Sequence, residues 1–236
     1  MTLLQLLINR LAALVQTRQV WTWNDYLGLT GNSVEANVIS DTGVNAANIA
    51  GEAAAPGIAS LDTGAGTAGG SGRRVGASGA AFLLLGGGWY RFQSRVRVSD
   101  LSDGTDTFIA LSGLTDIDAA NDQTANGVYF RYTHSESGGD WTCVARDNSV
   151  ESTVDSGVPV VADTFASLEI YVDAAAANAR YYINGALVGT ISANIPTATG
   201  RELNLIPANI KKSAGTNARQ IQVDYWNLFG SLSTER

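Results

Sequence analysis

Apolar and polar residues alternate one by one along several short stretches of this chain, and this period of two is what most constrains its fold. The clearest stretch is Trp89–Val98, where Tyr90, Phe92, Val96 and Val98 share one face. Arginines and a glutamine occupy the other face. Successive side chains of a strand point to opposite faces, so the pattern predicts an antiparallel strand with one buried face.

Similar stretches follow, separated by turn residues about every 8–12 residues, as in all-β sandwiches. They lie at 107–111, 128–132, 141–145, 168–172, 181–183, 186–188 and 221–229. Asn184-Gly185, between two of them, is a strong signal for a two-residue hairpin. No internal repeat of fixed period is visible, which disfavours a propeller or solenoid. The sequence therefore predicts an all-β protein, an antiparallel β-sandwich of jelly-roll type, over residues 21–236.

The first part of this domain, residues 31–80, is rich in Gly, Ala, Ser, Thr and Asn. Pro56-Gly57 and Gly69-Gly70 are turn signals within it. We expect either a long arm or irregular edge strands with loops. The stretch from Gly64 to Gly79 is the part most expected to be loop.

Residues 1–20 contain the one convincing helical pattern, at residues 3–16. Its apolar stripe is formed by Leu4, Leu7, Ile8, Leu11, Leu14 and Val15. Fourteen residues are marginal as a lone helix in water, so the stripe must be buried. It can pack on the chain's own β-domain, on copies of itself or in a partner's groove, and we expect an anchoring or oligomerisation role.

Composition excludes several partners. The net charge is −7 and the only lysines are Lys211 and Lys212, so no basic stripe is available for nucleic acid or an anionic membrane. The apolar N-terminal run is too short to span a bilayer, and Arg10 interrupts it without a basic region before it. We expect synthesis in a cytoplasm without a signal peptide. Cys143 is the only cysteine, so no intrachain disulfide can form.

Catalytic patterns are missing from the sequence. Glycosidases need two carboxylates flanking one bond, whereas the glutamates here are isolated along the chain. Glu169 shares a strand face with Tyr171 and Asp173, which is either half of a carboxylate pair or a solvated face. His134, the single histidine, is expected in a surface loop, and Cys143 is expected to be a buried small hydrophobe. We therefore expect no enzyme activity.

Two groups of aspartates are candidates for calcium, which prefers clustered oxygen ligands in loops. One group is Asp116, Asp118 and Asp122, and the other is Asp100, Asp103 and Asp106. Turn-forming aspartates without any metal are the alternative. No other cofactor is expected.

Exposed aromatic residues are candidates for glycan binding. Trp21, Trp23 and Tyr26 follow the helix and could stack on a sugar, or pack on the sandwich or a neighbouring subunit. Tyr129, Arg131 and Tyr171 are further residues expected to point outward.

Four segments carry a resemblance to a known superfamily. They are Arg180–Pro196 (RYYINGALVGTISANIP), Gly127–Thr133 with Trp141–Asn148, Arg219–Leu228, and Gly86–Phe108. Together they resemble the concanavalin A-like lectin/glucanase (laminin-G-like) superfamily, and in particular the jelly-roll domains of tailed-phage virion proteins, over roughly residues 80–230. The resemblance implies two curved antiparallel sheets, often in a trimer, with a structural or receptor-binding role.

From these observations we expect a virion structural protein located on the phage particle, either a fibre or attachment module or a head decoration. It would assemble with itself, as a trimer, and with other virion proteins. The alternative is a carbohydrate-binding, lectin-like module for bacterial surface glycans.

Overall fold

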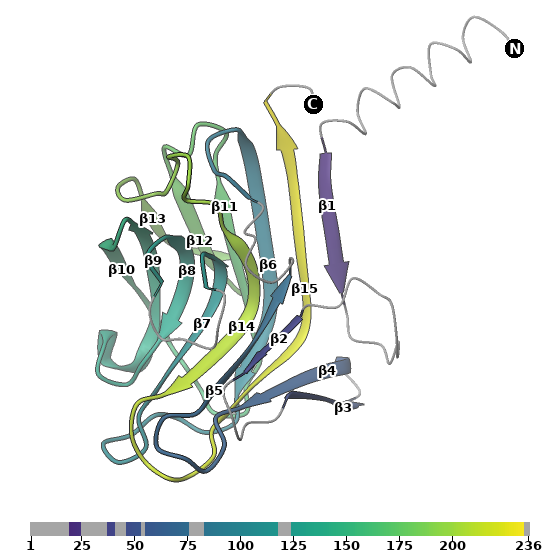
Figure 1. Ribbon diagram of the computed structural model, residues 1–236, viewed down its shortest axis with the longest axis vertical. Helices are drawn as coiled ribbons and strands as arrows, with labels where there is room; N and C mark the ends of the chain where they lie inside the picture. The colour runs from purple at the N-terminus through teal and green to yellow at the C-terminus, as the bar shows by residue number, and fades with distance from the viewer. Residues whose placement is uncertain are drawn as a thin grey trace, which may run out of the picture.

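The computed structural model describes residues 19–24, 37–40, 46–52, 55–75, 83–117 and 124–233. Within them the chain forms two antiparallel sheets packed face to face, so the predicted β-sandwich is confirmed (Figure 1). The helix expected at residues 3–16 lies outside the described residues. No helix in the described part is long and apolar enough to cross a membrane.

Sheet A is the larger of the two sheets. In spatial order its strands are β13 (Ala186–Ile191), β12 (Ala179–Ile183), β11 (Ala166–Val172), β6 (Gly88–Val98), β15 (Gln220–Leu232), β4 (Ala55–Asp62) and β3 (Ala46–Glu52), with β1 (Gln19–Asn24) also paired to β15. Sheet B is formed by β10 (Val150–Pro159), β9 (Asp140–Asp147), β8 (Gly127–Tyr132), β7 (Phe108–Thr115), β14 (Asn204–Lys212), β5 (Gly70–Val75) and β2 (Asn37–Ser40). A short 3-10 turn, Ser137–Gly139, precedes β9.

The core lies between the sheets and is built from the apolar positions of the alternating strands. Phe130 is at its centre, with its ring edge-on to Tyr181 of the opposite sheet at 5.3 Å and to Trp141 at 6.4 Å. Such edge-to-face pairs add to the gain from burying the rings. The Tyr181 hydroxyl donates a 2.5 Å hydrogen bond to the Val144 carbonyl, so the buried polar group is satisfied.

A second, smaller apolar cluster lies on the other face of sheet B. It consists of Leu111, Ile117, Tyr129, Val144 and Ile206. Tyr129 was expected to point outward, but its side chain is buried at 2 % exposure. Burial raises its pKa to about 12.

Of the two expectations for residues 31–80, a long arm or edge strands with loops, the structure shows edge strands: β3 and β2 lie at the ends of sheets A and B. Four strands, β2 to β5, lie in this stretch, and β4 contains the Pro56-Gly57 pair that signalled a turn. The expectation of a loop from Gly64 to Gly79 is wrong over Gly70–Val75, because these residues form β5 and are buried. Gly70 permits this strand, since a Cβ there would lie 2.7 Å from the Lys211 Cδ atom on β14.

Candidate functional site

The outward face of sheet A carries side chains in rows that run across the strands. Register places Tyr171 of β11 directly between Arg91 of β6 and Arg180 of β12. On its other side Arg91 is paired with Phe229 of β15. Directly opposed residues of antiparallel strands lie close together on one face, so these residues, far apart in sequence, form one surface.

An open pocket of about 370 Å³ lies in this surface. Trp89 and Arg91 on β6 pair with Ser231 and Phe229 near the end of β15, and this end of β15 is at the top of Figure 1. We call this cavity the aromatic pocket, and its lining residues are Trp89, Arg91, Glu169, Tyr171, Arg180, Tyr182 and Phe229.

Trp89 is the central ring of the aromatic pocket. It stacks on Tyr171 with centroids 6.0 Å apart and planes 30° apart, and meets Phe229 edge-on at 5.3 Å. All three rings are half-buried, so each keeps part of its surface in solvent. Cross-strand packing fixes the rings and thus forms a ready-made apolar platform.

Polar groups surround the platform. Glu169 accepts hydrogen bonds from the Arg91 guanidinium at 2.7 Å and from the Gln93 amide at 2.5 Å. The hydrogen bond that Arg91 donates to Glu169 raises the pKa of Arg91. Apolar rings with a few placed polar groups are the usual composition of a small-molecule site.

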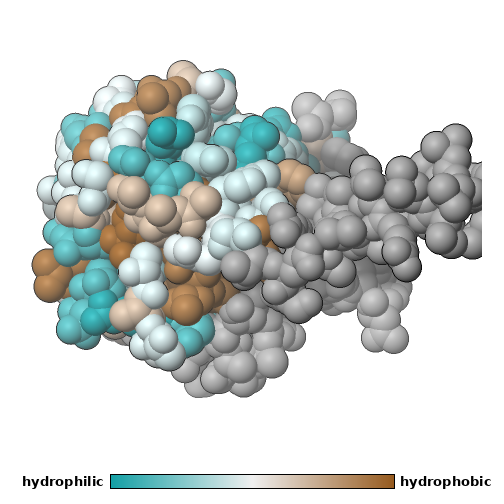
Figure 2. Space-filling model, turned by 90° about the horizontal axis from the view of Figure 1, so that it is seen from above, coloured by the Kyte–Doolittle hydropathy of each residue, from teal (hydrophilic) through white to brown (hydrophobic). Residues whose placement is uncertain are grey.

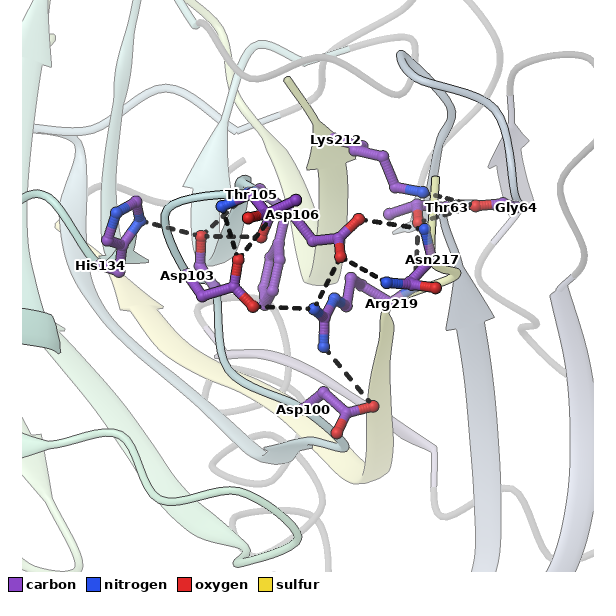
Figure 3. A network of polar contacts seen from close by, with 12 residues as sticks. Thr63, Gly64, Asp100, Asp103, Thr105, Asp106, His134, Lys212, Asn217 and Arg219 are labelled. Atoms are coloured by element: carbon purple, nitrogen blue, oxygen red, sulfur yellow. Dashed lines mark hydrogen bonds and ion pairs between the residues drawn. The ribbon is translucent and has the colours of Figure 1, made fainter. Parts of the chain in front are cut away.

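A second polar cluster lies at the opposite end of the sandwich, in the loops before β7 and β15. We call it the Arg219 network, and Figure 3 shows its side chains converging. The Arg219 guanidinium lies 3.2 Å from Asp106, 3.3 Å from Asp103 and 3.8 Å from Asp100. Asp106 also accepts hydrogen bonds from the Asn217 backbone N–H at 3.0 Å and side-chain amide at 2.5 Å.

The carboxylates of Asp106 and Asp103 are held in the ionised form. Hydrogen bonds from the Asn217 backbone and side chain lower the pKa of Asp106, and Arg219 lowers it further. The backbone N–H groups of Asp106 and Thr105 lower the pKa of Asp103. Hydrogen bonds to the charged form of a carboxylate have this effect.

The network does not fit a calcium ion. Arg219 brings its own positive charge among the three aspartates, and the Asp106 oxygens already accept N–H donors. In the other candidate group, Asp116 accepts hydrogen bonds from the backbone of Ala125 and Asn126 and from the Thr124 hydroxyl. Asp118 and Asp122 lie outside the described residues. Among those described, no three acidic, histidine or cysteine side chains gather as a metal site.

The remaining sequence candidates are dispersed over the fold. Trp21 and Trp23 lie on β1, paired in register with Phe229 and Asn227, whereas Tyr26 lies outside the described residues. The helix residues Leu4, Leu7, Ile8, Leu11, Leu14 and Val15 also lie outside them.

Arg131, expected to point outward, is largely buried on sheet B. Its guanidinium pairs with Glu136 at 2.6 Å and Glu151 at 2.8 Å. Burial by itself would lower the pKa of Arg131, but the hydrogen bonds to these carboxylates outweigh it and raise the pKa. Arg131 therefore has a structural role, which is to pair with Glu136 and Glu151 on sheet B.

Two single residues behave as the sequence indicates. Cys143 is fully buried, and burial raises the pKa of its thiol to about 12. His134 lies in a turn, with Nδ1 3.1 Å from the Ser102 hydroxyl.

Sequence reasoning found Tyr171 and Glu169 but missed most of the aromatic pocket. Trp89 and Arg91 are on the polar face of the most regular alternating stretch, so their outward direction was available from the sequence. Their meeting with Arg180 and Phe229 was not, because strand order and register decide it.

Outside the pocket, large apolar side chains are scattered. In Figure 2, which looks onto the end bearing the aromatic pocket, hydrophobic and hydrophilic residues are interspersed over the coloured atoms. Among the described residues, the exposed large hydrophobic ones are Leu101, Val150, Val161 and Leu187. Isolated exposed residues of this kind are normal on soluble surfaces.

A family model described as "SO2946-like, C-terminal domain" matches residues 54–224. No curated protein matches the chain. The fold is similar to that of a protein of unknown function, SO2946 from Shewanella oneidensis MR-1, with a TM-score of 0.64 and 12% identity over 100% of this chain and 97% of that one.

Two further structures share the fold. An endo-1,3-beta-glucanase from Streptomyces sioyaensis has a TM-score of 0.57 and 12% identity, over 91% of this chain and 97% of that one. The potassium-bound carbohydrate recognition domain of Emp46p has a TM-score of 0.57 and 8% identity, over 88% and 98%. At these identities the likeness establishes the lectin/glucanase type of jelly roll and nothing finer.

Proposed function

The chain belongs to the SO2946-like family, since the model of that family's C-terminal domain matches residues 54–224, and we propose that the sandwich formed by these residues is the functional unit. We propose that its aromatic pocket binds carbohydrate. The observation that carries the proposal is the partly exposed Trp89 ring, fixed between Tyr171 and Phe229 beside charged side chains. The C–H groups of a sugar ring carry slight positive charge and pack on the electron-rich face of an aromatic ring. Arginine and glutamate at the rim can exchange hydrogen bonds with sugar hydroxyls.

The fold supports this proposal. One neighbour in fold is a carbohydrate recognition domain, and another is a glucanase. Both act on sugars according to their names, so the sandwich is a scaffold on which sugar sites occur. Fold likeness by itself is an argument by analogy.

Binding without catalysis is the form of the proposal that the pocket favours. Among the described residues that line the pocket, Glu169 is the single carboxylate, and it is hydrogen-bonded to Arg91 and Gln93. Hydrolysis by the usual route needs a second carboxyl group about 5–10 Å from the first. The pocket therefore has a platform for a sugar but no pair to cleave one.

The proposal is tested by electrophoresis of the protein through native gels that contain a soluble polysaccharide. Glucan, galactan, mannan and their acidic counterparts are suitable probes. Binding retards migration in at least one gel, and unchanged migration in all of them would refute carbohydrate binding.

Assembly on a phage particle is a second proposal, favoured by the apolar stripe at Leu4, Leu7, Leu11 and Leu14. In this role the stripe docks the chain to copies of itself or to other virion proteins, and the sandwich faces outward as a fibre, attachment or decoration module. A particle-level image that locates the protein tests it. The two proposals are compatible, since an attachment module can bind a surface glycan.

A further inference from the structure

Arginines on the outward face of sheet A differ in how their charges are compensated. Arg91 pairs with Glu169 at 2.7 Å, Arg95 with Asp224 at 2.5 Å, and Arg97 with Glu52 at 2.6 Å. Arg180 makes no ion pair or side-chain hydrogen bond with any described residue. Its one close partner in this part of the chain is the Tyr171 ring, whose centroid lies 5.8 Å from the guanidinium carbon.

Burial opposes the ionisation of Asp173, but hydrogen bonds from Asn178 and Ala177 outweigh it and lower the pKa of Asp173, and the charge of Arg180 lowers it further. The hydrogen bonds of this carboxylate are nevertheless directed elsewhere. It accepts from the Ala177 backbone N–H at 2.8 Å and from the Asn178 amide at 3.0 Å, closing the turn between β11 and β12. Within the described part of the chain no side chain accepts the five N–H donors of Arg180, so they can serve a ligand.

The lining residues of the aromatic pocket therefore carry an excess of positive charge. Arg91 and Glu169 neutralise each other, and Arg180 remains, on a chain whose net charge is −7. Contact with the face of Tyr171 holds the guanidinium at the pocket and leaves its edge available. A planar guanidinium is suited to bind a carboxylate or sulfate through two parallel hydrogen bonds.

We infer that the aromatic pocket selects an acidic sugar, whose ring packs on Trp89 and whose anionic group binds Arg180. The inference rests on the proposed carbohydrate-binding function and adds the class of ligand. The shared chemistry is an oxyanion on a sugar ring, which a uronic acid or a sulfate ester can supply. Neutral sugars lack the anionic group and bind more weakly, through the ring platform and hydrogen bonds to their hydroxyls.

The test measures affinity for pairs of polysaccharides that differ in the acidic group. Three pairs compare a neutral with a carboxylated chain: glucan with glucuronan, galactan with polygalacturonate, and mannan with polymannuronate. A fourth pair, dextran with dextran sulfate, tests the sulfate ester. The unmodified protein is expected to bind one acidic member about tenfold or more tighter than its neutral partner, the size expected of hydrogen bonds to a charged group. Sodium chloride should weaken the binding of the acidic polysaccharides only, because salt screens the attraction between charges.

Three variants assign that preference to Arg180. Arg180→Gln should abolish the preference, so that the variant binds each acidic chain no tighter than its neutral partner. Arg180→Lys should keep part of the preference, because lysine carries the charge without the planar fork. Lys211→Gln removes one positive charge on sheet B and should change nothing, which controls for net charge.

The outcomes separate this inference from the function on which it rests. Equal binding of neutral and acidic chains, unchanged by Arg180→Gln, would leave carbohydrate binding in place and overturn the acidic preference. An acidic preference that persists in Arg180→Gln would also overturn it. Binding to no member of any pair would overturn both.

Discussion

The rings of Trp89 and Tyr171 stack with their centroids 6.0 Å apart, although the two residues belong to different strands and are 82 positions apart in sequence. This contact depends on the register between β6 and β11. Sheet pairing therefore positions the site, and loops do not need to close over it.

The hydrogen bonds of Asp106 predict how stability depends on pH. Its pKa in the folded protein is lower than the unfolded value of about 3.9, so its stabilising contribution is complete above pH 4. That contribution is lost as the pH falls from about 4 through the folded pKa. Asp106→Asn should thus be less stable than the unmodified protein at pH 7, with a difference that shrinks towards pH 2.

Urea unfolding at a series of pH values between 7 and 2 measures this difference. A difference in unfolding free energy that stays constant as the pH falls would show that the ionised carboxylate of Asp106 does not stabilise the fold.

Gly215 permits the close approach of the Arg219 network. A Cβ at this position would clash with the Asp106 carboxylate, and its φ of +91° is unfavourable for other residues. Gly215→Ala should therefore lower the free energy of unfolding by about 1–3 kcal/mol, the range for such backbone strain. Gly104→Ala in the neighbouring loop has open space around its Cβ and is the matched control. Equal melting temperatures for the two variants would contradict this reading.

Cys143 should be inert in the folded protein. Its side chain is fully buried and burial raises the pKa of the thiol to about 12, so little thiolate is present at pH 8. A chromogenic disulfide reagent should react only after urea is added. Reaction at the rate of a free thiol in native buffer would show that the core opens at this strand.

The apolar stripe of residues 3–16 predicts self-association. Leu7→Glu combined with Leu11→Glu places charges in the expected interface and should reduce the oligomer to a monomer, measured as mass in solution. Asn9→Glu, on the expected polar face, is the control and should keep the oligomer. A full-length protein that is already monomeric would contradict an oligomerisation role.

Local signals in the sequence predicted the strands whose patterns were regular. Asn184 and Gly185 have φ values of 51° and 82° and join β12 to β13, as their turn chemistry requires. The strand Asn204–Lys212 is not among the predicted strands, and it contains Pro207, which lacks an N–H group and is unusual in a central strand. The ladder accommodates it at a β-bulge, with register shifts towards both neighbouring strands.

The pocket shows the other limit of a single sequence. Alternation indicates that Arg91, Tyr171 and Arg180 face outward, but which strands become neighbours depends on the whole fold. These residues form a row only because of the register between the strands. The sequence therefore indicates that each residue faces outward, but not that they are neighbours.

Binding of Trp89→Ala and Tyr225→Ala to the polysaccharide that retards the unmodified protein tests the central claim most directly. Tyr225 is paired with Arg95 on the same face of sheet A and does not line the pocket, so its loss controls for removal of a surface ring. Circular dichroism and melting temperature establish that both variants are folded. We predict that Trp89→Ala lowers affinity by about tenfold or more, of the order of one lost aromatic contact, whereas Tyr225→Ala leaves it unchanged. Equal affinity of a folded Trp89→Ala variant and the unmodified protein would contradict the account.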